Sequence, residues 1–209
     1  MSNYKVEQRM VGPIMENCYL IVNTDTKEAL IIDPGAEAGK IKGMVDKCEA
    51  KPVAILLTHG HYDHIGAVNE IKRMYDIPVY VHETEDELLE ETKTGQLRYM
   101  GITEPVEGDE RLHGEPELNL AGFSIKVFHT PGHTKGGVCY YFKNEGVLFS
   151  GDTLFRGSVG RTDFPGGSMS ELVHSIEDKL FTLPEDTKVY PGHEGETSIG
   201  FEKVYNPFF

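Results

Sequence analysis

The stretch Thr58-His59-Gly60-His61-Tyr62-Asp63-His64 packs three imidazoles and one carboxylate into a few neighbouring residues. It follows an apolar run, residues 53–57, that predicts a buried strand, and it precedes a segment with helical periodicity, residues 65–75. An H-x-H-x-D-H pattern on a strand-to-helix loop brings nitrogen and oxygen ligands together, as a borderline metal such as zinc requires. A His-rich surface tract is the alternative, but Asp63 interrupts the histidines. The stretch therefore predicts half of a metal site.

Composition limits the number of domains and the class of partner. With 209 residues and 39% hydrophobic content, the chain can bury a substantial core. No repeat or linker divides it, so we expect one domain over residues 1–209. The net charge of −14 argues against nucleic acid or an anionic membrane as a partner, because phosphate binding needs clustered Lys and Arg.

Cysteine usage and apolar run length predict the compartment. The three cysteines, Cys18, Cys48 and Cys139, are too few and too scattered for a disulfide framework. The first residues lack the apolar segment of a signal peptide, and no run approaches the roughly 20 apolar residues of a membrane span. We therefore expect a cytoplasmic protein. The pattern carries no signal of oligomeric state.

The N-terminal half predicts a sheet with helices packed on it. Segments 4–11, 18–23 and 29–32 predict three antiparallel strands with turn residues between them. The third strand leads into Asp33-Pro34-Gly35, where the proline biases Asp33 towards an extended conformation, and a helix follows over residues 36–48. Asp33 suits either a plain turn or a carboxylate that orients the histidine loop by hydrogen bonding.

The middle of the chain carries fewer signals of function. Residues 83–91 are strongly acidic and predict a helix with a solvated face. Residues 95–122 are broken repeatedly by Pro and Gly, which is typical of a loop-rich segment bordering an active site. We expect His82 and His174 to be structural and His113 to lie at the surface.

Three strands in the second half each lead to a further candidate ligand. The strand over residues 123–128 runs into His129-Thr130-Pro131-Gly132-His133, whose turn presents His133, whereas His129 stays within the strand pattern. A hairpin over residues 137–150 ends at Gly151-Asp152, and a strand over residues 188–190 ends at Pro191-Gly192-His193. Strand ends can meet at one edge of a sheet layer, which yields seven candidate ligands: His59, His61, Asp63, His64, His133, Asp152 and His193.

Seven ligands exceed the needs of one tetrahedral ion and suit two metals about 3.5 to 4 Å apart that share a carboxylate and a water-derived bridge. We expect zinc, with iron or manganese as alternatives. Two divalent ions lower the pKa of the bridging water to near neutrality, so Asp63 and Asp152 would act in catalysis through the metals and the bridging hydroxide. Arg161 suits either a substrate carboxylate or an ion pair with Asp163.

This motif set resembles the metallo-β-lactamase superfamily over nearly the whole chain. The resemblance implies an α+β fold, an αββα sandwich with the metals at one edge. The resemblance also implies how two metals would be held. One metal would bind His59, His61 and His133, and the other would bind Asp63, His64 and His193. Asp152 would bridge the two metals.

Within that superfamily the chain looks most like glyoxalase II, the hydroxyacylglutathione hydrolases, in their short bacterial branch. The resemblance implies a thioesterase that cleaves S-D-lactoylglutathione, or a related hydroxyacyl thioester, to the hydroxy acid and the thiol. The stretches that carry it are Gly151-Asp152-Thr153-Leu154-Phe155, Gly160-Arg161-Thr162-Asp163-Phe164-Pro165-Gly166-Gly167, Pro191-Gly192-His193, Thr197-Ser198-Ile199-Gly200 and Asn206-Pro207-Phe208.

Three other functions remain open. A persulfide dioxygenase of the same fold shares the Gly-Arg-Thr-Asp-Phe loop and would hold one Fe(II) on His59, His133 and Asp152, although the ending Pro191-Gly192-His193-Glu194 favours a hydrolase. A nuclease of this superfamily would need a basic surface. A noncatalytic metal-binding protein would be expected to show a degraded ligand set, and this chain keeps all seven candidates.

Overall fold

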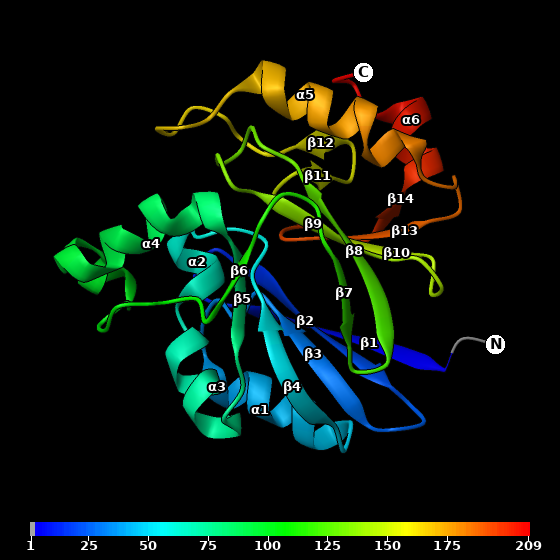
Figure 1. Ribbon diagram of the computed structural model, residues 1–209. Helices are drawn as coiled ribbons and strands as arrows, with labels where there is room; N and C mark the ends of the chain where they lie inside the picture. The colour runs from blue at the N-terminus through cyan, green and yellow to red at the C-terminus, as the bar shows by residue number, and fades with distance from the viewer. Residues whose placement is uncertain (1–2) are drawn as a thin grey trace.

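Two six-stranded sheets form the centre of the molecule in a computed structural model that describes residues 3–209. The sheets pack face to face, with helices on the outer side of each (Figure 1). The layers are therefore helix, sheet, sheet and helix, which confirms the expected αββα sandwich. No helix among residues 3–209 is long and apolar enough to cross a membrane.

The first sheet has the order β1-β2-β3-β4-β5-β6. Its first three strands are antiparallel, as expected, and β3 to β6 run parallel to one another. The strands are β1 (Tyr4–Val11), β2 (Glu16–Asn23), β3 (Glu28–Ile32), β4 (Lys51–Leu56), β5 (Val79–His82) and β6 (Glu110–Leu112).

The second sheet has the order β14-β13-β10-β9-β8-β7 and is antiparallel except between β10 and β13. A separate two-stranded ribbon, β11 and β12, follows β10. The strands are β7 (Glu117–Leu120), β8 (Phe123–His129), β9 (Val138–Phe142), β10 (Val147–Gly151), β11 (Leu154–Phe155), β12 (Ser158–Val159), β13 (Lys188–Pro191) and β14 (Thr197–Ser198).

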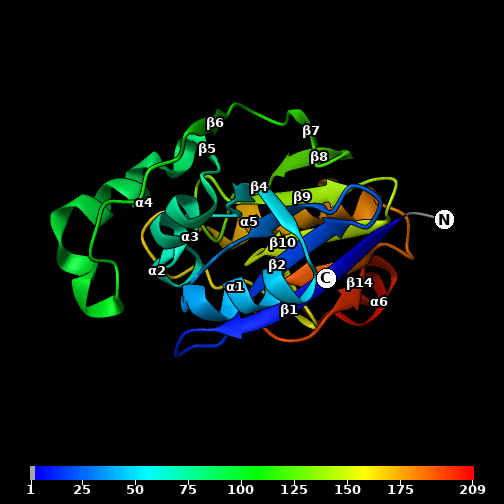
Figure 2. The same cartoon turned by 90° about the horizontal axis from the view of Figure 1, so that it is seen from below.

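Helices cover both outer faces. Figure 2 shows α1 lying across β1 and β2 of the first sheet, while α5 and α6 lie on the second (Figure 1). Ser168 caps α5, its side chain accepting a hydrogen bond from the Glu171 N–H. The α-helices are α1 (Ala38–Lys47), α2 (Tyr62–Ile65), α3 (Val68–Tyr75), α4 (Asp86–Glu91), α5 (Met169–Asp178) and α6 (Ile199–Tyr205), and the 3₁₀ turns are η1 (Glu83–Glu85), η2 (Thr92–Thr94), η3 (Gln96–Met100) and η4 (Leu180–Thr182).

Central strands such as β2 carry apolar side chains on both faces. One face packs against the helices and the other against the second sheet. Along β2, Leu20 and Val22 pack under α1, whereas Tyr19 and Ile21 point into the space between the sheets. Successive strand side chains alternate between faces, so a strand buried on both faces appears in the sequence as a continuous apolar run. The run from Leu20 to Val22 is therefore apolar because α1 covers one face of β2 and the second sheet covers the other.

The helix expected over residues 65–75 is divided into two. Helix α2 begins at Tyr62 and ends at Ile65, and α3 begins at Val68. Between them the Ala67 N–H donates to the Pro34 carbonyl at 2.9 Å, and a Cβ on Gly66 would lie 2.3 Å from the Gly35 carbonyl oxygen. The helix breaks because the chain meets the corner at the end of β3.

Asp33 at that corner does not adopt the extended conformation that the following proline favours. Its φ of 49° lies in the left-handed region, which aspartate tolerates better than most residues. The Asp33 carboxylate accepts hydrogen bonds from the Thr58 N–H at 2.7 Å and the Thr58 hydroxyl at 2.5 Å. These contacts with a distant segment outweigh the local preference.

The acidic segment over residues 83–91 is not only a solvated face. Glu85 is 1% exposed, and Leu88 and Glu91 line a cavity together with several of the candidate ligands. The walls of that cavity include α4, whereas none of its lining residues comes from the loop-rich segment 95–122.

Tyr140 joins the two sheets by a buried hydrogen bond, and we expect this bond to contribute to the free energy of unfolding. Its hydroxyl donates to the Leu57 carbonyl at 2.7 Å. Tyr140→Phe leaves this buried carbonyl without its partner, so we expect a loss of about 1–3 kcal/mol in the free energy of unfolding, measured by urea denaturation of metal-free protein. Tyr141→Phe, on the opposite face of β9, is the control. Equal losses in the two variants would contradict this account.

Candidate metal centre

The seven candidate ligands come together at one edge of the sandwich, on segments that follow strands of both sheets. His59 and His61 lie on the loop after β4, and Asp63 and His64 lie in α2. His133 follows β8, Asp152 follows β10 and His193 follows β13. Within this set, the side chains of His59, His61 and His133 form one close group, and those of Asp63, His64 and His193 form another.

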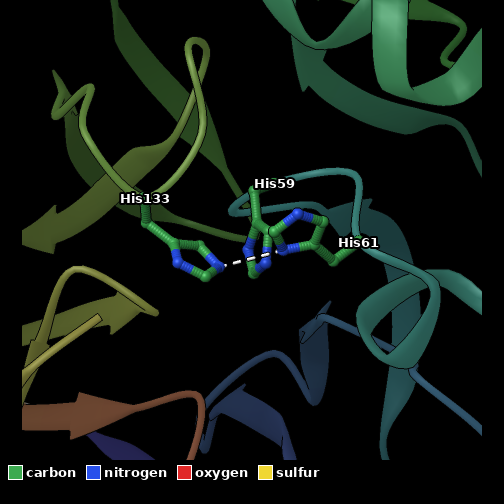
Figure 3. A group of neighbouring side chains, drawn as sticks. All are labelled: His59, His61 and His133. Carbon is green, nitrogen blue, oxygen red and sulfur yellow. Dashed lines mark hydrogen bonds between the residues drawn. The ribbon is translucent and has the colours of Figure 1, made fainter. Parts of the chain in front are cut away.

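The first group is His59, His61 and His133, whose ligand atoms all lie within 4.8 Å of one another. The Nδ1 atom of His61 is 2.9 Å from Nε2 of His133. Figure 3 shows the three rings converging, with His133 reaching across from a different loop. The ring of His59 is nearly perpendicular to both others, so its nitrogen atoms approach from a different direction.

The second group is Asp63, His64 and His193, with ligand atoms in the same range. Asp63 Oδ2 lies 3.2 Å from His193 Nε2 and 3.5 Å from His64 Nε2. Asp63 and His193 stand 130 positions apart in the chain. Their meeting therefore depends on the fold as a whole.

Asp152 lies between the two groups and contacts both. Its Oδ2 atom is 3.5 Å from Nε2 of His133 in the first group, and 3.7 Å from Nε2 of His193 in the second. Its Oδ1 atom is 3.4 Å from Nε2 of His64. A carboxylate in this place can contribute one oxygen to each of two neighbouring cations.

Buried atoms without partners show that these side chains fit cations. Eleven buried side-chain nitrogen or oxygen atoms among residues 3–209 have no hydrogen-bond partner, and three of them lie together in this centre: His59 Nε2, His64 Nε2 and Asp152 Oδ1. Buried polar atoms are rarely left unpaired, because losing water without replacement is unfavourable. All three belong to the candidate ligand set, and imidazole nitrogen with carboxylate oxygen suits divalent zinc, iron or manganese.

Hydrogen bonds on the far side of two rings set which nitrogen faces the centre. His133 Nδ1–H donates to the Arg161 carbonyl at 2.7 Å, so its Nε2 is free to bind a cation. His64 Nδ1 lies 3.0 Å from Oδ2 of Asp33, which leaves His64 Nε2 free. His59, His64 and Asp33 also form a close group, but the Asp33 carboxylate is already engaged by Thr58, so its contacts are those of an orienting residue.

The loop carrying His193 is held by Asn17 and Tyr19, for which the sequence predicted no role in the site. Asn17 Nδ2 donates to the carbonyls of Pro191 and Glu194, at 3.0 and 2.9 Å. The Tyr19 hydroxyl donates to the Pro191 carbonyl at 2.7 Å. A Cβ on Gly192 would lie 2.3 Å from Asp152 Oδ1, so only glycine allows the loop to approach this closely.

The two groups differ in their affinity for protons. Burial lowers the pKa of His61 to about 4, assisted by His133, and burial lowers the pKa of His59 and His133 as well. Burial also opposes a charge on His64, but Asp152 and Asp33 outweigh it and hold the His64 pKa well above its ordinary value.

The other members of the second group are shifted by their mutual contact. The hydrogen bond with Asp63 outweighs burial and raises the pKa of His193. Burial opposes ionisation of Asp63 and Asp152, but the neighbouring histidines outweigh it and hold the pKa of each carboxyl below its usual range. The first group therefore holds protons more weakly than free imidazole does, whereas His64 and His193 hold them more tightly.

The remaining histidines lie away from this centre. His129 stacks on His82, with ring centroids 4.3 Å apart, and its Nε2–H donates to the Lys135 carbonyl. His113 is exposed and pairs with Glu83 at 2.7 Å. His174 lies on α5, with its Nδ1 2.6 Å from the Ser170 carbonyl.

A cavity of about 580 Å³ opens over the centre. Its apolar walls come from separated parts of the chain: Ile14, Leu88, Phe155, Val159 and Phe164. Glu91 and Glu194 also line it, and Arg161 is the one Lys or Arg among its lining residues. The cavity therefore combines apolar walls with a floor of candidate metal ligands.

Arg161 is held in an ion pair at this wall. Its guanidinium donates two hydrogen bonds to Asp163, both 2.7 Å long, and lies 4.0 Å from the centre of the Phe164 ring. This is the ion pair that the sequence offered as an alternative to a substrate contact. Arg161 still lines the cavity, so its side chain is within reach of a ligand there.

Comparison with known proteins gives the family. Residues 11–193 match the model of the metallo-beta-lactamase superfamily. The probable metallo-hydrolase YqgX of Bacillus subtilis is 43% identical over 95% of this chain and 94% of its own length. The hydroxyacylglutathione hydrolase GloC of Haemophilus influenzae is 37% identical over the same shares of the two chains.

Solved structures agree with this comparison. The crystal structure of the BLEG-1 B3 metallo-beta-lactamase is 44% identical, with a TM-score of 0.91 over 98% of this chain and 99% of that one. TTHA1623 in a di-iron-bound form is 37% identical, with a TM-score of 0.87 over 97% and 100% of the two chains. The family model covers most of the chain, and both the His/Asp cluster and the fold match the family. This chain belongs to the metallo-β-lactamase superfamily.

Proposed function

We propose that this protein is a thioesterase that holds two divalent cations and hydrolyses S-D-lactoylglutathione or a related hydroxyacyl thioester. The observation that carries the proposal is the position of Asp152, whose two oxygens face the two ligand groups at the floor of the cavity. The similarity to a hydroxyacylglutathione hydrolase of Haemophilus influenzae supports the thioester substrate. Zinc is our first choice of metal, and the di-iron form of TTHA1623 supports iron as the alternative.

Two bound divalent cations would supply hydroxide at neutral pH and polarise the acyl carbonyl. The chain contributes the geometry and the surroundings. His59, His61 and His133 would hold one cation, and Asp63, His64 and His193 the other, with Asp152 shared. The apolar walls exclude water from a bound acyl group and strengthen the electrostatic interactions beside it. A thiolate is a good leaving group and needs no acid from the protein.

Two other activities are distinguished by their chemistry. A mononuclear persulfide dioxygenase would use His59, His133 and Asp152, but Asp63, His64 and His193 group equally closely, which favours two cations. One iron per chain with persulfide-dependent oxygen uptake would support the dioxygenase. The similarity to BLEG-1 supports β-lactam hydrolysis as a second candidate, and turnover of a chromogenic cephalosporin with no turnover of the thioester would favour it.

Removing Asp63 tests the dinuclear mechanism. Asp63→Ala deletes one member of the second group, so we expect metal content to fall from about two ions to about one per chain. Hydrolysis of S-D-lactoylglutathione should fall by more than about 100-fold, beyond the usual effect of a residue that only orients a ligand. Metal analysis and a thioester assay measure the two effects. Asp46→Ala on α1 is the control, and full turnover in Asp63→Ala would count against two cations.

Metal binding should release protons from one group only. His64 and His193 have raised pKa values, so a cation competes with protons for their nitrogen atoms, and the affinity of the second group for the cation rises with pH around neutrality. The first group is already neutral well above the His61 pKa of about 4 and should bind without proton release. Calorimetric titration with Zn²⁺ in buffers of different ionisation heat should show about two to three protons released per chain, because the water that becomes hydroxide between the two cations also gives up a proton.

Asp63→Ala provides the comparison for this measurement, because it disables the second group. Proton release should then fall by the contribution of His64 and His193 while one cation still binds. Equal release from the wild type and the variant would contradict the assignment of protons to His64 and His193.

The Arg161–Asp163 ion pair predicts how the cavity selects the thiol carrier. Arg161 holds the pKa of Asp163 near 2, so Asp163 is ionised and neutralises the guanidinium that could bind a carboxylate. Asp163→Asn frees this guanidinium. The measured quantity is the ratio of two kcat/KM values, that for the D-lactoyl thioester of anionic N-acetylcysteine divided by that for the D-lactoyl thioester of uncharged N-acetylcysteamine. In Asp163→Asn this ratio should rise about 2- to 5-fold, the range for an exposed ion pair.

Adding Arg161→Gln to Asp163→Asn should abolish this gain, because the freed guanidinium is then missing. The Arg161 carbonyl that orients His133 is unaffected by the substitution. An unchanged ratio in Asp163→Asn would show that Arg161 does not contact the carrier.

A further inference from the structure

Glu85 is a buried carboxylate that is not among the seven candidate ligands. It ends η1, immediately before α4, and is 1% exposed. Its Oε2 atom accepts a hydrogen bond from the Gly60 N–H at 2.7 Å. Its Oε1 atom accepts two more, from the Gly136 N–H at 2.8 Å and from the Thr134 hydroxyl at 2.6 Å.

The donors belong to the two loops that carry the first ligand group. Gly60 lies between His59 and His61, on the loop that follows β4 of the first sheet. Thr134 follows His133 directly, on the loop between β8 and β9 of the second sheet. One carboxylate therefore connects the two loops, which belong to different sheets, at the point where their histidines face each other.

We propose that Glu85 is a positioning residue that holds the loop of His59 and His61 at the distance from the loop of His133 that a cation requires. The inference rests on the cation site of the proposed function and not on the substrate. It concerns this chain's own hydrogen bonds, so it can be tested by metal affinity alone.

The energetic argument begins with the cost of burying a carboxylate. Such a group is strongly unfavourable in the interior unless it is fully hydrogen-bonded. Burial raises the pKa of Glu85, and the three donors oppose that rise. Two of the donors are backbone N–H groups, so the carboxylate fixes the main chain of each loop and not merely a mobile side chain. Without it, these N–H groups would lose their buried acceptor.

The packing around these contacts leaves the loops little freedom to separate independently. A Cβ on Gly136 would lie 2.5 Å from the Thr84 hydroxyl oxygen and 2.7 Å from the Glu85 nitrogen, and a Cβ on Gly60 would lie 3.1 Å from Glu85 Oε2. An ion pair between these segments, Lys135 with Glu87, is exposed at both ends, and exposed pairs contribute little. Buried hydrogen bonds from Val138 to Thr58 and from Tyr140 to Leu57 join the two sheets just before the histidine loop, whereas Glu85 joins the loops beside the histidines themselves.

Glu85 also connects the ligand loops to the wall of the cavity. Helix α4 begins at the next residue, and Leu88 and Glu91 of this helix line the cavity. The same carboxylate therefore sets the position of one cavity wall relative to His61 and His133.

The substitution Glu85→Gln breaks one connection selectively. The amide oxygen can still accept from Thr134 and Gly136, but the NH₂ group then faces the Gly60 N–H, so two donors oppose each other. In an Asp63→Ala background only the first group remains complete, and Zn²⁺ affinity, measured by competition with a chromophoric chelator, reports on that group alone. Here we expect Glu85→Gln to weaken binding about 10- to 100-fold, the range for residues that orient metal ligands.

The complementary background is His61→Ala, in which the first group is disabled and the second remains. There Glu85→Gln should leave Zn²⁺ affinity unchanged. Glu87→Gln, an exposed glutamate on the same segment, is the matched control in both backgrounds. Thr134→Val, which removes a donor on the other loop, should weaken the first group, and Thr134→Ser, which keeps the hydroxyl, should restore it.

A merely structural role gives a different result. Equal loss of affinity in the two backgrounds, or affinity in Glu85→Gln equal to that in Glu87→Gln, would overturn the proposal. If Glu85→Gln does not fold, the Thr134→Val and Thr134→Ser pair decides the question by the same titration. If Asp63→Ala keeps both cations, the ligand assignment itself is wrong, which separates that failure from a failure of the Glu85 inference.

Discussion

The structure depends on imidazole and carboxylate atoms brought into one small volume without hydrogen-bond partners of their own. His59 Nε2, His64 Nε2 and Asp152 Oδ1 are buried and unpaired within the described residues. Protein interiors rarely tolerate such atoms unless a cation or water completes them. Two cations, one in each ligand group and both in contact with Asp152, would therefore supply the partners that these atoms lack.

The two sheets make this convergence possible. Strands buried on both faces run to one edge of the sandwich, and each loop there is held by contacts from a different part of the chain. Asp33 holds the Thr58 end of the histidine loop, Asn17 and Tyr19 hold the His193 loop, and the Arg161 carbonyl orients His133. The candidate ligands are thus held from several elements at once, as preorganised metal ligands require.

Much of this arrangement could be predicted from the sequence. The H-x-H-x-D-H stretch is local, and the later candidate ligands each follow a segment with a strand pattern, so both signals can be read along the chain. The sandwich was predicted from the family resemblance that these motifs carry. The structure also places His133, and not His129, in the centre, because the turn after β8 projects it beyond the strand.

The remainder could not be read locally, because it depends on contacts between distant residues. Asp33 takes a left-handed conformation in which its carboxylate accepts hydrogen bonds from Thr58, 25 positions away. Glu85 stands in an acidic run that resembles a solvated helix, and nothing in that run indicates that its partners are Gly60 and Gly136. The break between α2 and α3 likewise comes from a collision with Gly35.

The central claim is that one carboxylate, Asp152, is shared by two cations at this edge of the sandwich. The most direct test is an anomalous-diffraction map from crystals of the protein grown with zinc. The account predicts two peaks, one beside His59, His61 and His133 and one beside Asp63, His64 and His193, with Asp152 in contact with both. A single peak, or peaks away from Asp152, would contradict it.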